Sequence, residues 1–354
     1  MSPCLHQYIE RSSGRIRDER FVGDPWIRLL YSELRENAPA LFRALTSARM
    51  SQLLAQLNYD APLARRLLGN RNFLKTCGVD ESECVPQSSG RGFRTWREIF
   101  ERKIHYERCR PMSENPSLVV SPCDARVLVG SLSDSSAVFI KNKFFLYEEL
   151  LGPSRSDWLR VFRQGECALF RLTPDKYHYN HAPVSGRVAD HYVIDGAHHS
   201  CNPQAVVALA TPYSKNRRVV TILDTDFPDG TGVGFVAMIE VVALMIGDIV
   251  QCYSECGYGA PRPVTTDLFL RRGCPKSLFR PGSSTVVLLF QKGRVRFSED
   301  LLANAQRVDV QSRFSNGFSQ TLVETDVRVR ETIAHPSEFT LRQPHGNSTI
   351  ERGV

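Results

Sequence analysis

Residues 281–290 read Pro281-Gly-Ser-Ser-Thr-Val-Val-Leu-Leu-Phe290. The apolar second half, followed by the turn sequence Gln-Lys-Gly at 291–293, predicts a buried strand over residues 285–290. The small residues before it allow close approach to the backbone, so a serine hydroxyl there can attack the carbonyl of the preceding residue. By itself, a Gly-Ser-Ser step is more often an ordinary loop. Other parts of the sequence are needed to distinguish a reactive serine from an ordinary loop.

The composition favours a folded enzyme or binding domain over a disordered chain. The sequence has 354 residues, of which 42% are hydrophobic, enough for the core of one large domain or two modest ones. The net charge of +7 is compatible with an anionic lipid surface. No dense pattern of arginines and aromatic residues indicates a nucleic-acid partner. The ten cysteines include no Cys-x-x-Cys pair, so no metal site is predicted.

The sequence shows no sign of targeting through or into a membrane. Residues 1–20 are polar and charged, unlike a signal peptide, and no run approaches the roughly 18 apolar residues of a spanning helix. We therefore expect a cytoplasmic protein, with peripheral attachment to a membrane surface left open.

The periodicity of apolar residues divides the chain into four segments. We expect a loose N-terminal tail over residues 1–24, and a helical region over 25–112, where leucines recur at helical spacing from Pro25 to Leu57. A β-rich, mainly antiparallel domain follows over 113–334, and 335–354 form a disordered tail. The predicted class is α+β, with N-terminal amphipathic helices before the β-rich domain. Expected strands are 118–120, 125–130, 137–140, 167–172, 186–194, 205–210, 219–223, 234–242, 246–253, 285–290 and 295–297, with short helices at 93–103 and 144–151.

Two further motifs change the interpretation of the Gly-Ser-Ser-Thr step. One is Tyr177-His-Tyr-Asn-His-Ala-Pro183, which contains His178 and His181, and the other is Ser121-Pro-Cys-Asp124. With the Gly-Ser-Ser-Thr step, in the same order and at similar separations, they resemble the phosphatidylserine decarboxylase family. The resemblance covers roughly residues 25–334.

This resemblance implies an enzyme that makes its own cofactor. In the family, an internal serine attacks the preceding carbonyl to form an ester, β-elimination splits the chain, and the new N-terminus becomes a pyruvoyl group. The resemblance assigns Asp124, His181 and the cleavage serine to a triad, and assigns His178 mainly to decarboxylation of the substrate.

Elementary chemistry agrees with these assignments. A serine is a poor nucleophile at neutral pH and needs a base, which is often a histidine oriented by a carboxylate. Pro183 and Gly186 favour a turn near the two histidines, so His178 and His181 are expected to reach one pocket. The alternatives are an ordinary histidine for each, and a turn residue for Asp124.

The cleavage position depends on the register of the motif. Relatives have the serine six residues before the phenylalanine, and counting back from Phe290 reaches Ser284, with Ser283 at the position of the family's glycine. A shift of one residue would instead cut between Gly282 and Ser283. We prefer Ser284 as the pyruvoyl precursor, with cleavage near 283/284. The two fragments are expected to stay associated, and a homodimer is compatible with the sequence.

The motifs leave two substrate classes open. Phosphatidylserine, converted to phosphatidylethanolamine with release of CO2, is the default by resemblance. Arg272-Gly-Cys-Pro-Lys276 replaces the family's Lys-Gly-Asp-Glu-x-Gly stretch and Ala125 replaces a glycine, so the alternative is a soluble decarboxylase of a free amino acid, aromatic ones included. A relative that is not processed, or a Ser-His-Asp hydrolase, is less favoured, because the Gly-x-Ser-x-Gly elbow is missing.

Overall fold

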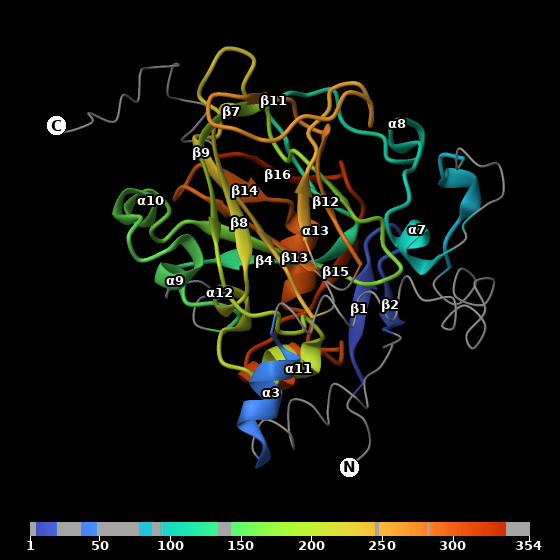
Figure 1. The fold of residues 1–354 in the computed structure, drawn as a ribbon, viewed down its shortest axis with the longest axis vertical. Coiled ribbons are helices and arrows are strands. Elements are labelled where there is room, and N and C mark those ends of the chain that lie inside the picture. The colour runs from blue at the N-terminus through green and yellow to red at the C-terminus, as the bar shows by residue number, and fades with distance from the viewer. Residues whose placement is uncertain are drawn as a thin grey trace.

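The computed structural model describes residues 5–19, 37–47, 78–86, 93, 95–133, 143–244, 248–281 and 284–337. These residues form an α+β fold built on one large, mostly antiparallel sheet, as the sequence predicts (Figure 1). Within these ranges, no helix combines the length and apolar character needed to cross a bilayer.

The large sheet has ten strands in the order β11-β7-β8-β9-β13-β5-β4-β15-β1-β2. All neighbours are antiparallel except β1 and β15. The strand β13 lies between β9 and β5, near the middle of the sheet. The bounds are β1 (Gln7–Glu10), β2 (Arg15–Asp18), β4 (Ala125–Ser131), β5 (Glu166–Leu172), β7 (Gly186–Ile194), β8 (Arg218–Asp224), β9 (Phe235–Val241), β11 (Phe269–Leu270), β13 (Ser284–Phe290) and β15 (Thr325–Val327).

Two small sheets cover one face of the large sheet. One has the order β10-β12-β6 and the other β14-β16-β3. A single core cluster joins alternate residues of β13, such as Val286 and Leu288, to Phe279 of β12 and Val295 of β14. The bounds are β3 (Val119–Val120), β6 (Tyr179–His181), β10 (Ile249–Gln251), β12 (Pro275–Phe279), β14 (Val295–Phe297) and β16 (Thr332–Pro336).

Helices cover the opposite face. The other residues of β13, Val287 and Leu289, belong to a second cluster with Leu150, Val206 and Phe314 from three helices. Because successive side chains of a strand alternate between faces, the all-apolar β13 is buried on both sides. The covering helices are α9 (Tyr147–Leu151), α10 (Ser156–Val161), α11 (Pro203–Ala208), α12 (Pro212–Lys215) and α14 (Arg313–Phe318).

Four further α-helices and one 3-10 turn complete the secondary structure of the described residues. The short α7 (Trp96–Phe100) and α8 (Tyr106–Cys109) lie on the β1–β2 side of Figure 1, away from α9 and α10. The single turn η3 (Glu81–Glu83) precedes them. The helix α3 (Pro39–Leu45) packs Phe42 against Ala205 of α11, and α13 (Glu299–Ala305) packs near β4.

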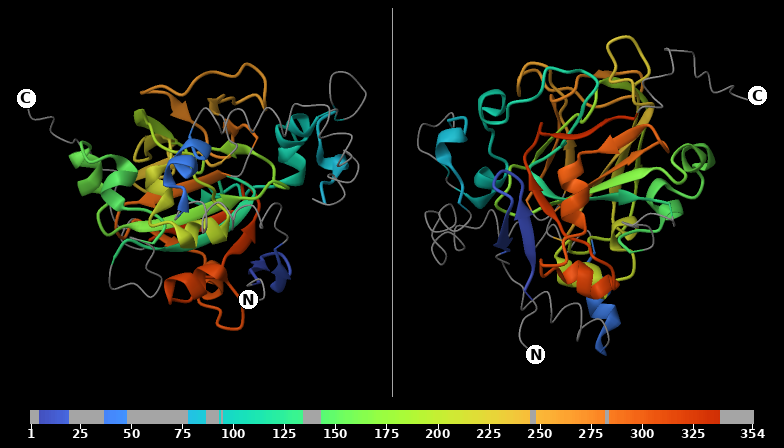
Figure 2. Two further views of the ribbon diagram at one scale, coloured as in Figure 1. Left: turned by 60° about the horizontal axis from the view of Figure 1, so that its bottom comes forward. Right: turned by 180° about the vertical axis from the view of Figure 1, so that it is seen from behind.

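The N-terminus differs from the expected loose tail over 1–24. Residues 7–10 and 15–18 form a hairpin, and β1 adds to the large sheet beside β15 (Figure 2). The physical reason is the fully buried Ile9, which packs against Val310 and Val323. The N-terminal end of the chain is therefore joined to its C-terminal quarter.

One predicted strand is wrong. Residues 205–210 lie largely in the helix α11, which begins at an Asn202 N-cap followed by Pro203, a strong start signal for a helix. Of the predicted helical region 25–112, the structure describes residues 37–47, 78–86, 93 and 95–112, which contain α3, η3, α7 and α8. The predicted strand 137–140 and nearly all of the predicted tail 335–354 lie outside the described residues, but Pro336 ends β16.

Candidate active site

The histidine motif lies on and just before β6, in the small sheet that covers β13. Asn180, between the two histidines, donates to Glu240 Oε1 of β9 at 3.2 Å and to Ser277 Oγ of β12 at 3.1 Å. These bonds fasten the motif strand to the large sheet.

His181 is fully buried and both ring nitrogens have partners. Nδ1 is 2.8 Å from the carbonyl oxygen of Gly273, and Nε2 is 2.9 Å from the hydroxyl of Tyr177. The ring of Tyr106 from α8 meets it edge-on at 4.8 Å between centroids. Burial lowers the pKa of His181 to about 4, so the ring is neutral at pH 7 and one nitrogen keeps a lone pair.

His178 has different surroundings. Its ring stacks on Phe100 of α7 at 3.4 Å between centroids, and neither of its nitrogens has a hydrogen-bond partner among the described residues. Burial lowers its pKa to about 3. The two histidines, expected in one pocket, contact different helices. His178 is left with unused hydrogen-bonding capacity in a buried place, which is costly unless a ligand or the reaction uses it.

Asp124 lies immediately before β4 and is bound by a guanidinium. Arg110 donates to its carboxylate at 2.8 Å, and the backbone N–H of Val329 donates at 2.8 Å. Burial opposes ionisation, but these donors hold the pKa of Asp124 below its usual range. The expected hydrogen bond from Asp124 to His181 is not formed, because Arg110 occupies the carboxylate.

Ser284 is the first residue of β13, opposite Leu172 of β5. It is fully buried, and its hydroxyl has no hydrogen-bond partner among the described residues. Ser284 is two residues before Val286, so the two side chains lie on the same face of β13. Val286 is opposite Glu240, on the face that β6 and β12 cover, and Ser284 therefore lies on that face too. Gly282 and Ser283 lie outside the described residues.

Sequence reasoning missed a buried ion pair beside the motif. Lys276 Nζ is 2.7 Å from Glu240 Oε2, both side chains have 0% exposure, and Gln251 bonds to both. Glu240 also accepts from Ser277 and Asn180. The signal was present: a glutamate inside the apolar run 235–241 and a lysine in the buried strand β12 need partners.

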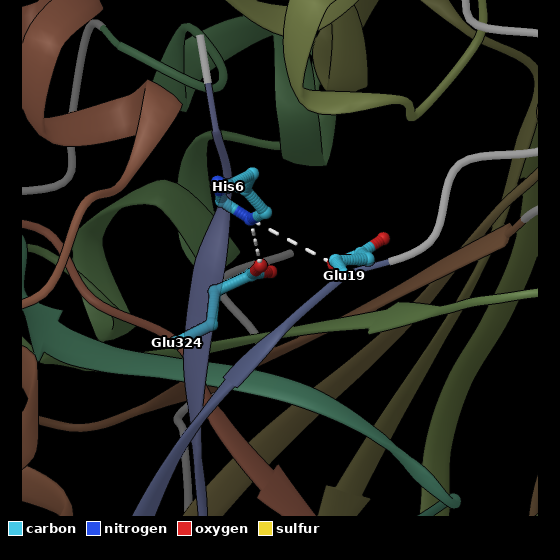
Figure 3. A group of neighbouring side chains, drawn as sticks. All are labelled: His6, Glu19 and Glu324. Carbon is cyan, nitrogen blue, oxygen red and sulfur yellow. Dashed lines mark hydrogen bonds and ion pairs between the residues drawn. The ribbon is translucent and has the colours of Figure 1, made fainter.

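A second buried cluster has the residue types of a metal site. His6, Glu19 and Glu324 converge, as Figure 3 shows, but the Arg171 guanidinium donates to both carboxylates at 2.6 Å. Nδ1 of His6 accepts from the backbone N–H of Arg313, so Nε2 carries the proton and donates to Glu324. The positive charge that two carboxylates require is already supplied by arginine, so the cluster is a structural ion-pair network.

A surface cavity of about 610 Å³ opens beside His181. Tyr106 and Tyr258 line it together with Arg108 and Glu255. Tyr258 bonds to the hydroxyl of Tyr177, and Tyr177 bonds to His181. The cavity is therefore linked to the buried histidine by the two tyrosine hydroxyls, and Tyr106 contacts both.

The candidate site thus combines a buried serine at the start of a central strand with a neutral histidine on β6 and an ionised aspartate just before β4. The profile of the phosphatidylserine decarboxylase family matches residues 96–315. The chain belongs to the phosphatidylserine decarboxylase family, whose activity is that of a carboxy-lyase.

Individual relatives are similar at modest identity. The phosphatidylserine decarboxylase proenzyme of Chlamydia trachomatis serovar L2 is 29% identical over 88% of this chain and 96% of its own length. That of Clostridium tetani is 30% identical over 84% of this chain and 91% of its own. The phosphatidylserine decarboxylase proenzyme 3 of Schizosaccharomyces pombe is 28% identical over 96% of this chain, which spans only 32% of that longer protein.

Proposed function

We propose that this protein is a pyruvoyl-dependent decarboxylase that converts phosphatidylserine to phosphatidylethanolamine and CO2 after cutting itself before Ser284. The main support for this proposal is the environment of the Ser284 hydroxyl. Its hydroxyl is buried at the start of a central strand with no hydrogen-bond partner among the described residues, whereas a serine in an ordinary loop would be hydrated or bonded.

The site fits a cofactor made from Ser284. A pyruvoyl group would replace the serine without adding a bulky molecule, and it would stand on the sheet face that β6 and β12 cover. Its ketone supplies an electron sink for the electrons released when CO2 leaves a substrate that carries an amine.

Three side chains are assigned roles on this basis. His181 is the base for self-cleavage, because it is neutral and retains a lone pair. Asp124 is a fixed negative charge near His181, held ionised by Arg110. His178 is assigned to decarboxylation, since its nitrogens are buried and unpaired among the described residues.

The two pieces produced by the cut are proposed to remain together. The C-terminal piece would begin with β13, which is hydrogen-bonded to β9 on one side and to β5 on the other. Removing it would expose apolar residues on both faces of the sheet, at a cost of about 25 cal/mol for each Å² exposed.

The test is intact mass measurement of the purified protein, followed by incubation with phosphatidylserine in micelles and with each of the twenty free amino acids. Two fragments with a pyruvoyl N-terminus, and CO2 from the lipid, are expected. Turnover of a free amino acid but not the lipid would replace the substrate and keep the chemistry. A single uncut chain would refute the proposed function.

A further inference from the structure

The hydrogen bonds of His181 determine where its protons lie. The carbonyl oxygen of Gly273 can only accept, so Nδ1, 2.8 Å away, carries the hydrogen. Nε2 therefore holds the lone pair, and the Tyr177 hydroxyl at 2.9 Å donates to it. In this arrangement the lone pair that a base would use is already occupied.

Tyr177 has a second partner that can release this lone pair. Its hydroxyl is 2.7 Å from that of Tyr258, and either oxygen can be the donor. Tyr258 in turn accepts from the backbone N–H of Ile104 at 3.1 Å and reaches the carbonyl of Ile104 at 3.0 Å. Burial raises the pKa of both tyrosines, so each hydroxyl keeps its one proton.

These contacts permit two arrangements of the same two protons. In the first, Tyr258 donates to Tyr177 and Tyr177 donates to His181. In the second, Tyr177 donates to Tyr258, Tyr258 donates to the carbonyl of Ile104, and Nε2 of His181 has no donor. Every hydroxyl is satisfied in both, so exchange requires two O–H rotations and no movement of the backbone.

We propose that Tyr177 and Tyr258 form a two-position hydroxyl switch that controls whether His181 can act as a base. This rests on the proposed role of His181 in self-cleavage. With Nε2 released, the proton of Ser284 Oγ passes to Nε2 as Oγ bonds to the carbonyl carbon of Ser283. The carbon–nitrogen bond between the residues then breaks, and the proton passes from Nε2 to the departing nitrogen.

The charged and titratable groups around the switch stay the same in both arrangements. Those that influence or contact His181 are Asp124, Arg110, Arg330, Tyr106 and Tyr177. Tyr258 is the only member of the switch that lines the cavity, so it is the point at which an occupant of the cavity can bias the switch.

The test is an NMR titration of the His181 ring in uncut Ser284→Ala protein, with a second substitution at one tyrosine. Tyr177→Phe removes a donor to the neutral ring, so the pKa of His181 should rise. Tyr258→Phe removes the alternative acceptor, so Tyr177 should donate to His181 permanently and the pKa should fall. Shifts in opposite directions are expected, whereas a simple packing role predicts shifts in the same direction or none.

The matched control is Tyr106→Phe. Its ring is also next to His181 and lines the same cavity, but its hydroxyl makes no hydrogen bond within the described residues, so the titration should be unchanged. In protein that retains Ser284, Tyr258→Phe should slow cleavage about tenfold. Same-direction or absent shifts would overturn the switch even if fragments and CO2 still form.

A second variant covers the case in which Tyr258→Phe fails to fold. Because Tyr258 accepts from Tyr177 only in the second arrangement, placing 3-fluorotyrosine at position 258 disfavours that arrangement: it keeps the ring and hydroxyl but makes the oxygen a weaker acceptor. It should favour the first arrangement, lower the pKa of His181 and slow cleavage. An unchanged titration in this variant would also contradict the proposal. Because the titration uses uncut protein, it gives an answer even if the wild-type chain never cuts.

Discussion

Two buried ionic clusters, built from similar residues, connect different parts of this protein. Glu240 and Lys276 join β9 to β12 and hold Asn180 of the histidine motif. Arg171 joins β5 to Glu19, after the N-terminal hairpin, and to Glu324, just before β15. The first cluster therefore positions the candidate active site, and the second ties the two ends of the chain to the large sheet.

The position of the cut determines which of the two clusters stays within one piece of the chain. The proposed cleavage before Ser284 would leave Glu240 and Lys276 in one piece, but would place Glu324 and Arg171 in different pieces. Ser284→Ala should abolish cleavage completely, because no hydroxyl remains to attack. Intact mass would show one chain of 354 residues. Ser283→Ala is the control and should still be cut; the opposite pattern would move the cut to Gly282–Ser283.

The next largest effects concern a third buried carboxylate, Asp124. Asp124→Asn and His181→Ala should slow cleavage by about 10²–10⁴-fold, since the serine loses its base or the charge that supports it. His178→Ala should still cut but release little CO2. A time course on denaturing gels measures the first effect and CO2 release the second. The control is Asp157→Asn, at an exposed ion pair, which should behave as wild type. Normal cutting by Asp124→Asn and His181→Ala would remove Asp124 and His181 from the mechanism.

Substitutions in the two clusters should have different effects on cleavage rate, although both should lower stability. Glu240→Gln leaves Lys276 buried without its counter-charge and loosens Asn180, so both stability and cleavage rate should fall. Arg171→Met leaves two buried carboxylates and should cost roughly 3–5 kcal/mol of unfolding free energy. Its cleavage rate, measured well below the melting temperature, should stay near that of wild type. Denaturant titrations with cleavage time courses decide this, and equal losses of cleavage in both variants would erase the distinction.

Acid should affect the Arg171 cluster in a predictable direction. Although burial opposes ionisation, Arg171 and His6 hold the pKa of Glu324 well below its ordinary value of 4.5. The unfolded chain therefore binds a proton first as the pH falls. The stability from this carboxylate is complete above about pH 4.5 and is lost below it, by at most about 1.4 kcal/mol per pH unit. Glu324→Gln should flatten the pH dependence of unfolding in that range, and an unchanged slope would contradict the pairing.

The smallest effect should come from charges at the surface. Buried pairs are little screened, whereas a net charge of +7 acts through water and ions. Binding to phosphatidylcholine vesicles should require added phosphatidylserine and should weaken as salt is raised, while the unfolding free energy changes little. Vesicle sedimentation measures the binding. Equal binding to neutral vesicles would argue against electrostatic attachment.

The strands were the predictable part of this fold, because apolar runs such as 167–172, 219–223 and 285–290 are buried on both faces. The N-terminal hairpin was not predictable in this way. Arg15–Asp18 is largely exposed and polar, and the partner strand β15 lies about 300 residues away in sequence. A local sequence pattern cannot indicate that β1 will pair with a strand so far away in sequence.

The motifs indicated Asp124, His178, His181 and Ser284, but not what surrounds them. None of the three motifs includes Arg110, yet its guanidinium is bound to the carboxylate of Asp124. Tyr258 lies in a glycine-rich loop with no periodicity, and only the fold brings it next to Tyr177. Partners of this kind depend on tertiary contacts between segments that are far apart in sequence.

The central position of β13 has a consequence for how the protein is made. A ribosome synthesises β13 and β15 after every other strand of the large sheet. The sheet stays split between β9 and β5 until residues 284–290 have emerged, so a nascent chain that stops earlier presents two open edges. Under the proposed cleavage before Ser284, a product truncated before β13 lacks the attacking serine and cannot form the pyruvoyl group.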